Sequence, residues 1–162
     1  MTTELSSQIV MQAKLDQLPK LERWVEALAA ELVLPPALVH RIDLCVTELV
    51  TNLICYGYPN GAAGTVRIHG WRQGEQVIIR IEDDGIPFDP ISYASPELPS
   101  SLAEAAVGGR GIRLVRHFTD ALHHVRRAGG NELTLLFRSP DAGARSPAVS
   151  AAREFVSLDP AR

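Results

Sequence analysis

The spacing of apolar residues changes from a two-residue period to a helical period early in the chain. From Gln8 to Leu15 apolar and polar residues alternate, as in a short strand with one buried face. Between Leu18 and Leu34 the apolar residues recur every three or four positions, which predicts an amphipathic helix. Pro35-Pro36 ends this helix and opens a second one, to about Tyr56, because proline fits the first helical turn. The chain therefore begins with a strand and two consecutive helices.

Paired strands dominate the rest of the chain. Two alternating segments, Thr65 to Trp71 and Gln76 to Asp83, flank the turn Gln73-Gly74-Glu75 and predict a hairpin. Ala121 to Arg127 and Asn131 to Arg138 predict a second one. Hairpins need no crossover helix, so the sheet should be mixed and mostly antiparallel, with the helices on one face. The fold class expected from this order is α+β, a two-layer α/β sandwich.

Two segments have a different composition. A Pro/Ser-rich stretch, Ile86 to Ser101, is long for a simple connection and is typical of a lid or an unstructured loop. A short helix should follow it, from Ile112 to Phe118. We expect one domain over residues 1–138 and a flexible tail over residues 139–162, in which 151–158 is also compatible with a short helix.

The overall composition excludes several classes of protein. The chain has 162 residues, 46% of them hydrophobic, and a formal net charge of −3. It is too apolar for a disordered protein and has no apolar run of about 18 residues that would cross a membrane. It is not strongly basic, so broad contact with a nucleic-acid backbone is not expected. Met1 to Ser7 lacks the features of a signal peptide, and the cytoplasm is the expected location.

The two cysteines do not predict a disulfide or a metal site. Cys45 and Cys55 are ten residues apart on the second predicted helix, which separates them by roughly 15 Å along its axis. This separation is too large for a disulfide bond. We expect both to be small buried apolar side chains.

Glu48 and Asn52 lie one turn apart on the same face of the second helix. An Asn side-chain oxygen can help to hold magnesium, which takes oxygen ligands from one or two protein groups together with substrate phosphates. A carboxylate one turn away can accept a proton from a hydroxyl group or a water. Alone, the pair is equally compatible with a polar outer helix face.

Asp83-Asp84-Gly85 ends an apolar strand. A carboxylate at this position can face a pocket and accept a hydrogen bond from an amino group, and the glycine allows close approach of a ligand. Asp-Gly is also a common turn sequence, so this motif alone does not decide between the two interpretations.

Gly108-Gly109-Arg110-Gly111 precedes the short third helix. Backbone N–H groups at a helix N-terminus attract anions, so this segment is a candidate phosphate cradle. It is not a Walker A motif, because no Gly-Lys-Ser/Thr follows.

In chain order the three motifs are Glu48-x-x-x-Asn52, Asp83-x-Gly85 and Gly109-x-Gly111, and together they resemble the GHKL (Bergerat) ATP-binding fold of gyrase B and the histidine kinases. Within this fold the chain looks like the small anti-sigma-factor serine/threonine kinases of bacterial partner-switching systems. The resemblance covers about Ile9 to Phe137. The segments that carry it are Leu44 to Asn52, Asp83 to Pro90, Gly108 to Val115 and Gly129 to Thr134.

The resemblance implies a role for each motif residue. Asn52 would bind the Mg²⁺ that bridges the phosphates of ATP, and Glu48 would be the catalytic base that acts on a protein serine. Asp83 would accept a hydrogen bond from the adenine amino group, and Gly85 would leave room for the ring.

The remaining residues would surround the phosphates and the base. Gly109 and Gly111 would line the phosphates at the end of a lid that runs from about Phe88 to Gly108. Arg110 would neutralise charge near the γ-phosphate, although a surface position is the other interpretation. Thr134 would hydrogen-bond near the adenine.

The function that the resemblance implies is that of an anti-sigma factor and ATP-dependent protein serine/threonine kinase. It would phosphorylate a small STAS-domain antagonist and sequester a sigma factor until the unphosphorylated antagonist competes. ATP/ADP and Mg²⁺ would be the cofactors, and the protein would be a homodimer through the N-terminal strand and first helix. The alternative is a nucleotide-binding partner-switch module with little or no kinase activity. A histidine-kinase catalytic domain is disfavoured, because about 17 residues precede the first long helix.

Overall fold

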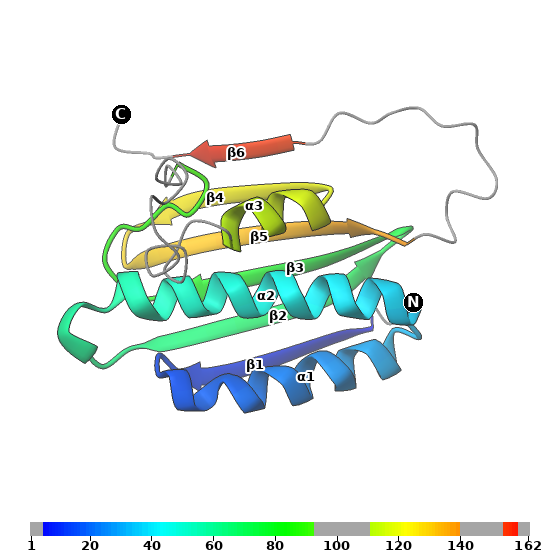
Figure 1. Cartoon of the computed structure of the whole chain (residues 1–162), viewed down its shortest axis with the longest axis horizontal. Coiled ribbons are helices and arrows are strands. Elements are labelled where there is room, and N and C mark those ends of the chain that lie inside the picture. Colours follow the sequence, from blue (N-terminus) through cyan, green and yellow to red (C-terminus); the bar gives the residue numbers. More distant parts are fainter. Residues whose placement is uncertain (1–4, 93–110, 140–153, 159–162) are drawn as a thin grey trace, which may run out of the picture.

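A computed structural model of the chain describes residues 5–92, 111–139 and 154–158. In these ranges six strands form one sheet in the order β1-β2-β3-β5-β4-β6 (Figure 1). The strands are β1 Ser6–Gln12, β2 Thr65–Gln73, β3 Gln76–Asp83, β4 Ala121–Arg127, β5 Gly130–Arg138 and β6 Glu154–Leu158. Neighbouring strands are antiparallel, except that β4 and β6 are parallel. The predicted α+β class and the mixed, mostly antiparallel sheet are confirmed.

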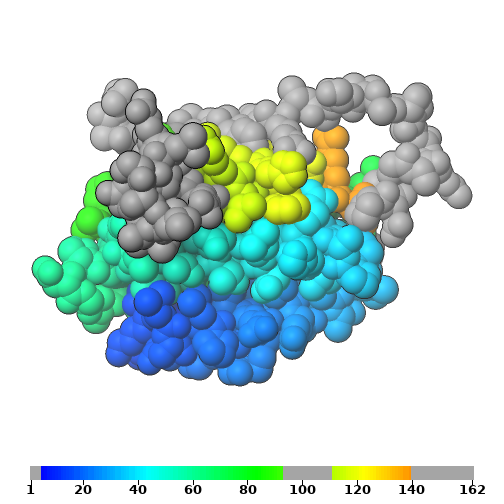
Figure 2. Space-filling model, viewed as in Figure 1, coloured from blue at the N-terminus to red at the C-terminus, as the bar shows by residue number. Residues whose placement is uncertain are grey.

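Among the described residues, three helices cover one face of this sheet (Figure 1). They are α1 Leu18–Glu31, α2 Pro36–Gly57 and α3 Gly111–Phe118, and short 3₁₀ turns lie at Leu15–Gln17 and Pro59–Gly61. The space-filling view shows α2 between α1 and α3 (Figure 2). Within the described ranges, no helix is both long and apolar enough to cross a bilayer.

The long helix α2 forms because its sequence carries an apolar stripe from end to end. The buried members of this stripe are Leu38, Ile42, Cys45, Val46, Leu49, Val50, Leu53, Ile54 and Gly57. They pack against the alternate residues of the sheet that face the helices, including Ile68, Ile79, Ile81, Leu133 and Leu135. Burial of an aliphatic side chain of this kind contributes about 1.5–3 kcal/mol, so this face holds α2 firmly on the sheet. Glu48 and Asn52 are carried by the most strongly anchored helix of the fold.

The structure differs from the sequence predictions in two places. Glu154–Leu158, within the predicted tail, forms a strand that pairs with β4, so the short helix considered there is wrong for these residues. Cys45 is fully buried as expected, and burial raises the pKa of its thiol to about 12. Cys55 is exposed, because it lies on the side of α2 away from the apolar stripe, and its predicted burial is wrong.

Candidate functional site

Glu48 and Asn52 lie half-buried on α2 and face the N-terminal end of α3. Gly111, the first residue of α3, fits so closely that an added Cβ would overlap Glu48 Oε2 and would lie 3.6 Å from Asn52 Nδ2. The structure therefore brings together the predicted base, the predicted metal ligand and one predicted phosphate-binding glycine. An amide oxygen, a carboxylate and a helix N-terminus form a suitable site for a Mg²⁺-bound triphosphate. Among the described residues, no cluster of three or more His, Cys, Asp or Glu side chains suits a metal ion.

Asp83 lies at the end of β3 on the face covered by the helices, and only 8% of its surface is exposed. Its Oδ1 atom accepts hydrogen bonds from the Gly85 backbone N–H at 2.8 Å and from Asn131 Nδ2 at 3.0 Å. Its Oδ2 atom is buried and has no hydrogen-bond partner in the described structure. Burial raises the pKa of the Asp83 carboxyl, and the two N–H donors and Arg126 oppose that effect. A buried acceptor without a partner fits the donor group of a bound base.

Asn131 is the residue of this site that the sequence analysis missed. It lies on β5 opposite Asp83 in the antiparallel register, and its side chain is 3% exposed. The signal that could have found it is alternation along β5. Leu133 and Leu135 face the helices, so Asn131 faces them too and reaches Asp83.

Thr134 lies on the opposite face of the sheet from Asp83. It is between the core residues Leu133 and Leu135, so its side chain points away from the helices. The structure does not bring it together with the other candidate residues. Gly109 and Arg110, and most of the predicted lid, lie outside the described residues.

Two glycines let the ends of the strands approach other backbone segments closely. A Cβ on Gly85 would lie 2.6 Å from the carbonyl oxygen of Gly57, at the end of α2, and 2.9 Å from Asp83 Oδ1. A Cβ on Gly130 would overlap the backbone of Asp83. Gly85 is therefore required for contact with α2. Its predicted role at a bound ring remains a separate prediction.

The adjacent aspartate, Asp84, has a structural role. It is exposed, and its Oδ1 atom accepts hydrogen bonds from the hydroxyl of Tyr58 at 2.7 Å and from the backbone N–H of Thr65 at 2.8 Å. These bonds lower the pKa of the Asp84 carboxyl, whereas burial and the bond to Asp84 raise the pKa of Tyr58. Asp84 thus links the end of α2 to the beginning of β2, while Asp83 faces the site.

The segment after β3 is held at several points. The Phe88 ring lies 5.5 Å from that of Tyr56 on α2, and Asp89 Oδ1 lies 3.5 Å from Nδ1 of the buried His124 on β4. Asp89 also accepts a hydrogen bond from the backbone N–H of Ile91 at 2.9 Å. The beginning of the predicted lid is therefore fixed to both layers of the fold.

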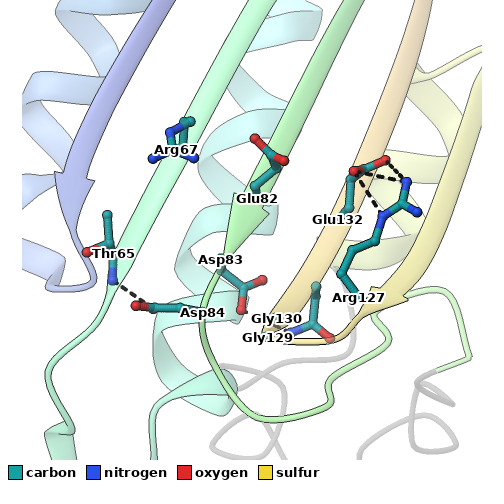
Figure 3. A pocket seen from close by; sticks show the side chains of 10 residues that line it. Thr65, Arg67, Glu82, Asp83, Asp84, Arg127, Gly129, Gly130 and Glu132 are labelled. Carbon is teal, nitrogen blue, oxygen red and sulfur yellow. Dashed lines mark hydrogen bonds and ion pairs between the residues drawn. The ribbon is translucent and has the colours of Figure 1, made fainter.

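A cavity of about 420 Å³ opens on the sheet face that carries no helix (Figure 3). Its wall is a row of charged residues from adjacent strands, Arg67, Glu82 and Glu132, and Arg127 pairs with Glu132 at 3.2 Å. In Figure 3 the helices lie behind the sheet, on the side of α2. Asp83 and Asn131 also line this cavity, so it adjoins the candidate site at the end of β3, whereas Glu48 and Asn52 are not part of its wall.

The chain is similar to an ATPase domain family, to a protein kinase and to an anti-sigma factor. A family profile described as a histidine kinase-like ATPase domain matches residues 11–137. The serine/threonine-protein kinase BtrW of Bordetella bronchiseptica is 34% identical over 116 residues, which cover 72% of this chain and 82% of BtrW. The anti-sigma F factor of Clostridium beijerinckii is 37% identical over 84 residues, which cover 52% of this chain and 59% of that protein.

The fold has a counterpart among solved structures. The crystal structure of the RsbU and RsbW domains of Rv1364c from Mycobacterium tuberculosis matches with a TM-score of 0.60. The match covers 83% of this chain and 32% of that chain, at 16% sequence identity. At this identity the likeness concerns the fold alone.

Proposed function

The chain belongs to the histidine kinase-like ATPase domain family, and from this premise we propose that it transfers the γ-phosphoryl group of ATP to a serine or threonine of a small STAS-domain antagonist protein. It is a serine/threonine protein kinase of the anti-sigma type. In the unphosphorylated state the antagonist competes with a sigma factor for the kinase, and phosphorylation releases the antagonist and leaves the sigma factor bound. With such partners the protein would act in the cytoplasm.

The observation that carries this proposal is the arrangement of two polar sites along α2. Glu48, Asn52 and Gly111 lie together at one site. The end of α2, at Gly57, contacts Gly85 beside the Asp83 carboxylate. Glu48 and Gly57 are nine residues apart, roughly 14 Å along the helix axis. This separation suits an extended nucleoside triphosphate with its base at Asp83 and its γ-phosphate near Glu48.

Glu48 is the catalytic base in this proposal. Its carboxylate accepts the proton of the substrate hydroxyl as the hydroxyl oxygen forms a bond to the γ-phosphorus. The bond from that phosphorus to the bridging oxygen breaks, and ADP leaves with the bond electrons. Phosphoryl transfer depends mainly on positioning and charge neutralisation, so the close fit of Glu48 against Gly111 is expected to matter.

Asn52 would hold Mg²⁺ through its amide oxygen, and the ion would neutralise charge on the phosphates when bound. Gly111 presents the N-terminus of α3 to the same region, and with Gly109 and Arg110 it would contact the phosphates. The Oδ2 atom of Asp83 would accept a hydrogen bond from the adenine amino group. This atom is buried and has no partner among the described residues.

We also propose a homodimer formed through β1 and α1. β1 is at one edge of the sheet, where its outer backbone groups are available for pairing. Large hydrophobic residues are exposed along and beside it. These are Leu5 at 51%, Val10 at 54% and Leu15 at 51% exposure. A cavity of about 300 Å³ beside Val10, Met11 and Lys20 adds a recess to this surface.

The test begins with calorimetric titration of the purified chain with ATP, with and without Mg²⁺. It continues with mass spectrometry of a purified STAS-domain antagonist incubated with the kinase and ATP. We expect Mg²⁺-dependent binding and one phosphorylated serine or threonine. The Glu48→Gln variant should bind ATP and lose transfer, since it keeps the shape of the side chain without the base. Binding without transfer by the wild type would support the alternative, a nucleotide-controlled binding module. A folded chain that does not bind ATP would refute both.

A further inference from the structure

Asn131 makes every hydrogen bond of which its side chain is capable. Its amide nitrogen donates to Asp83 Oδ1 at 3.0 Å and to the Ile86 carbonyl at 2.9 Å. Its amide oxygen accepts from the Phe88 backbone N–H at 3.3 Å and from Arg126 Nη1 at 3.3 Å. A primary amide has two N–H donors and one oxygen with two lone pairs, so this set is complete.

These four partners also fix which way the amide points. Asp83 Oδ1 and the Ile86 carbonyl can only accept, whereas the Phe88 N–H and the Arg126 guanidinium can only donate. A flipped amide would place acceptor against acceptor and donor against donor. Asn131 therefore presents a donor to Asp83 and not an acceptor.

Arg126 holds this arrangement from β4. It lies opposite Asn131 in the register of β4 and β5, and it donates to the Gly85 carbonyl at 2.9 Å as well as to Asn131. The guanidinium thus links the amide to the turn after β3. Both bonds come from Nη1, whose N–H groups join the Gly85 carbonyl oxygen and the Asn131 amide oxygen.

The consequence for Asp83 is an asymmetric carboxylate. Oδ1 accepts from Gly85 and from Asn131, while Oδ2 is buried without a partner in the described structure. A bound base therefore meets a single acceptor of fixed orientation. An amino group at that position gains a hydrogen bond to a charged group, whereas a carbonyl oxygen there faces a carboxylate oxygen and is repelled.

We propose that Asn131, held by Arg126, is a positioning residue that makes Asp83 select a base with an amino group, as in adenine, against one with a carbonyl oxygen, as in hypoxanthine or guanine. This inference rests on the proposed nucleotide site. Neither Asn131 nor Arg126 touches the reacting atoms in this proposal. Both act through the carboxylate of Asp83.

The charges around Asp83 support the same role. Burial raises the pKa of the Asp83 carboxyl, the Gly85 and Asn131 donors and the Arg126 charge lower it, and Asp84 raises it. Tyr58, with its raised pKa, stays neutral and adds no charge. Loss of Asn131 or Arg126 should therefore raise the pKa of Asp83 further, and a protonated Asp83 no longer distinguishes an amino group from a carbonyl oxygen in the same way.

The experiment compares the affinities of ATP and ITP by calorimetry across a pH series. ITP carries a carbonyl oxygen where ATP carries the amino group. The matched variants are Asn131→Thr and Asn131→Val, which have nearly the same shape, and only threonine keeps a donor for Asp83. We expect the wild type to prefer ATP and Asn131→Val to lose at least about tenfold of that preference, the usual effect of a hydrogen bond to a charged group. Asn131→Thr should keep most of it.

The pH profile gives a readout that a merely structural role would not change. In Asn131→Val, ATP affinity should begin to fall at a higher pH on acidification than in the wild type or in Asn131→Thr. Arg126→Met tests the second residue and should shift the profile in the same direction. If Asn131→Val does not fold, as judged by its melting curve, Arg126→Met carries the test.

The outcomes separate this inference from the proposed function. A folded wild type that binds neither nucleotide refutes the proposed function. A wild type that binds both nucleotides equally overturns the inference alone, because a phosphate site can exist without base selection. A wild type that prefers ATP, with an unchanged preference and pH profile in Asn131→Val and Arg126→Met, also overturns the inference and leaves the nucleotide site intact.

Discussion

Gly111 lies directly against the carboxylate of Glu48, with no room for a methyl group between the start of α3 and the face of α2. This contact joins the motif that contains Glu48 and Asn52 to the glycine motif at the start of α3, which are the first and last of the three motifs along the chain. It also gives the first prediction, because a single added carbon atom must displace the proposed catalytic base.

Gly111→Ala should reduce phosphate transfer more than it reduces ATP binding. The Glu48 side chain is flexible and can move away from the new methyl group, so the fold is expected to survive. A displacement on the order of 1 Å at the base costs up to about 100-fold in rate. Single-turnover kinetics and calorimetry separate the two effects. Gly129→Ala is the matched control, since no atom lies within 4 Å of its added Cβ. Equal transfer rates for both variants would contradict the assigned position of the base.

Asn52→Ala should remove the dependence of nucleotide binding on Mg²⁺ and leave the fold intact. The Asn52 side chain is half-buried and is not part of the apolar stripe that anchors α2 on the sheet, so its loss should not unfold the protein. The measurement is ATP titration with Mg²⁺ and with a chelator. If the variant keeps the full Mg²⁺ effect of the wild type, Asn52 is not the metal ligand.

Asp83→Asn should stabilise the fold at neutral pH while it weakens ATP binding. Burial raises the pKa of this carboxyl in the folded state, so ionised Asp83 opposes folding. Its contribution to stability is fully present below the pKa of the unfolded state and is lost as the pH rises through the folded-state pKa. We expect a higher Tm than that of the wild type at pH 7.

The same variant has a clear signature on acidification. The difference in Tm between Asp83→Asn and the wild type should shrink as the pH falls and Asp83 takes up a proton. Thermal melting across a pH series measures it. A variant less stable than the wild type at pH 7 would mean that the two N–H donors and Arg126 outweigh the burial of the charge.

Val10→Glu should weaken the proposed homodimer. Val10 is 54% exposed on the edge strand β1, and two glutamates brought together in an interface repel each other. Sedimentation over a concentration series should give a lower dimer fraction than the wild type. Glu82→Gln is the control, because Glu82 lies on the same face of the sheet but on β3, which does not pair with β1. An unchanged dimer fraction would mean that the dimer interface does not include Val10.

Val33→Gly should stabilise the protein by about 1 kcal/mol. Val33 follows the end of α1 with φ = 52°, a left-handed conformation that is unfavourable for a β-branched residue and natural for glycine. Its side chain is 84% exposed, so little packing is lost. Chemical denaturation measures the change. Val33→Ala should give a smaller gain, because alanine still carries a Cβ, and an equal or larger gain from alanine would argue against backbone strain as the cause.

The helices and hairpins could be predicted because the pattern that forms them is local. The apolar stripe of α2 and the alternation of β2 and β3 are complete within their own segments. The strand β6 could not be predicted in this way. It pairs in parallel with β4 across a long connection, and nothing in a short polar-apolar stretch indicates a distant partner.

The proximity of candidate residues could be predicted where helical spacing fixes it, whereas their roles stay predictions. Glu48 and Asn52 are one turn apart on a helix, so their proximity follows from the sequence. The role of Thr134 near the adenine follows from the family resemblance alone, and the two-residue period of β5 places Thr134 on the sheet face opposite to Asp83. The same period selects Asn131.

The contact between Gly57 and Gly85 makes the length of α2 a constraint on its evolution. One residue inserted between Asn52 and Gly57 would rotate the two ends of the helix by about 100° relative to each other and would lengthen it by about 1.5 Å. Either the end of β3 would lose its support or the face with Glu48 would turn away from α3. Insertions and deletions should therefore be confined to the loops that flank α2.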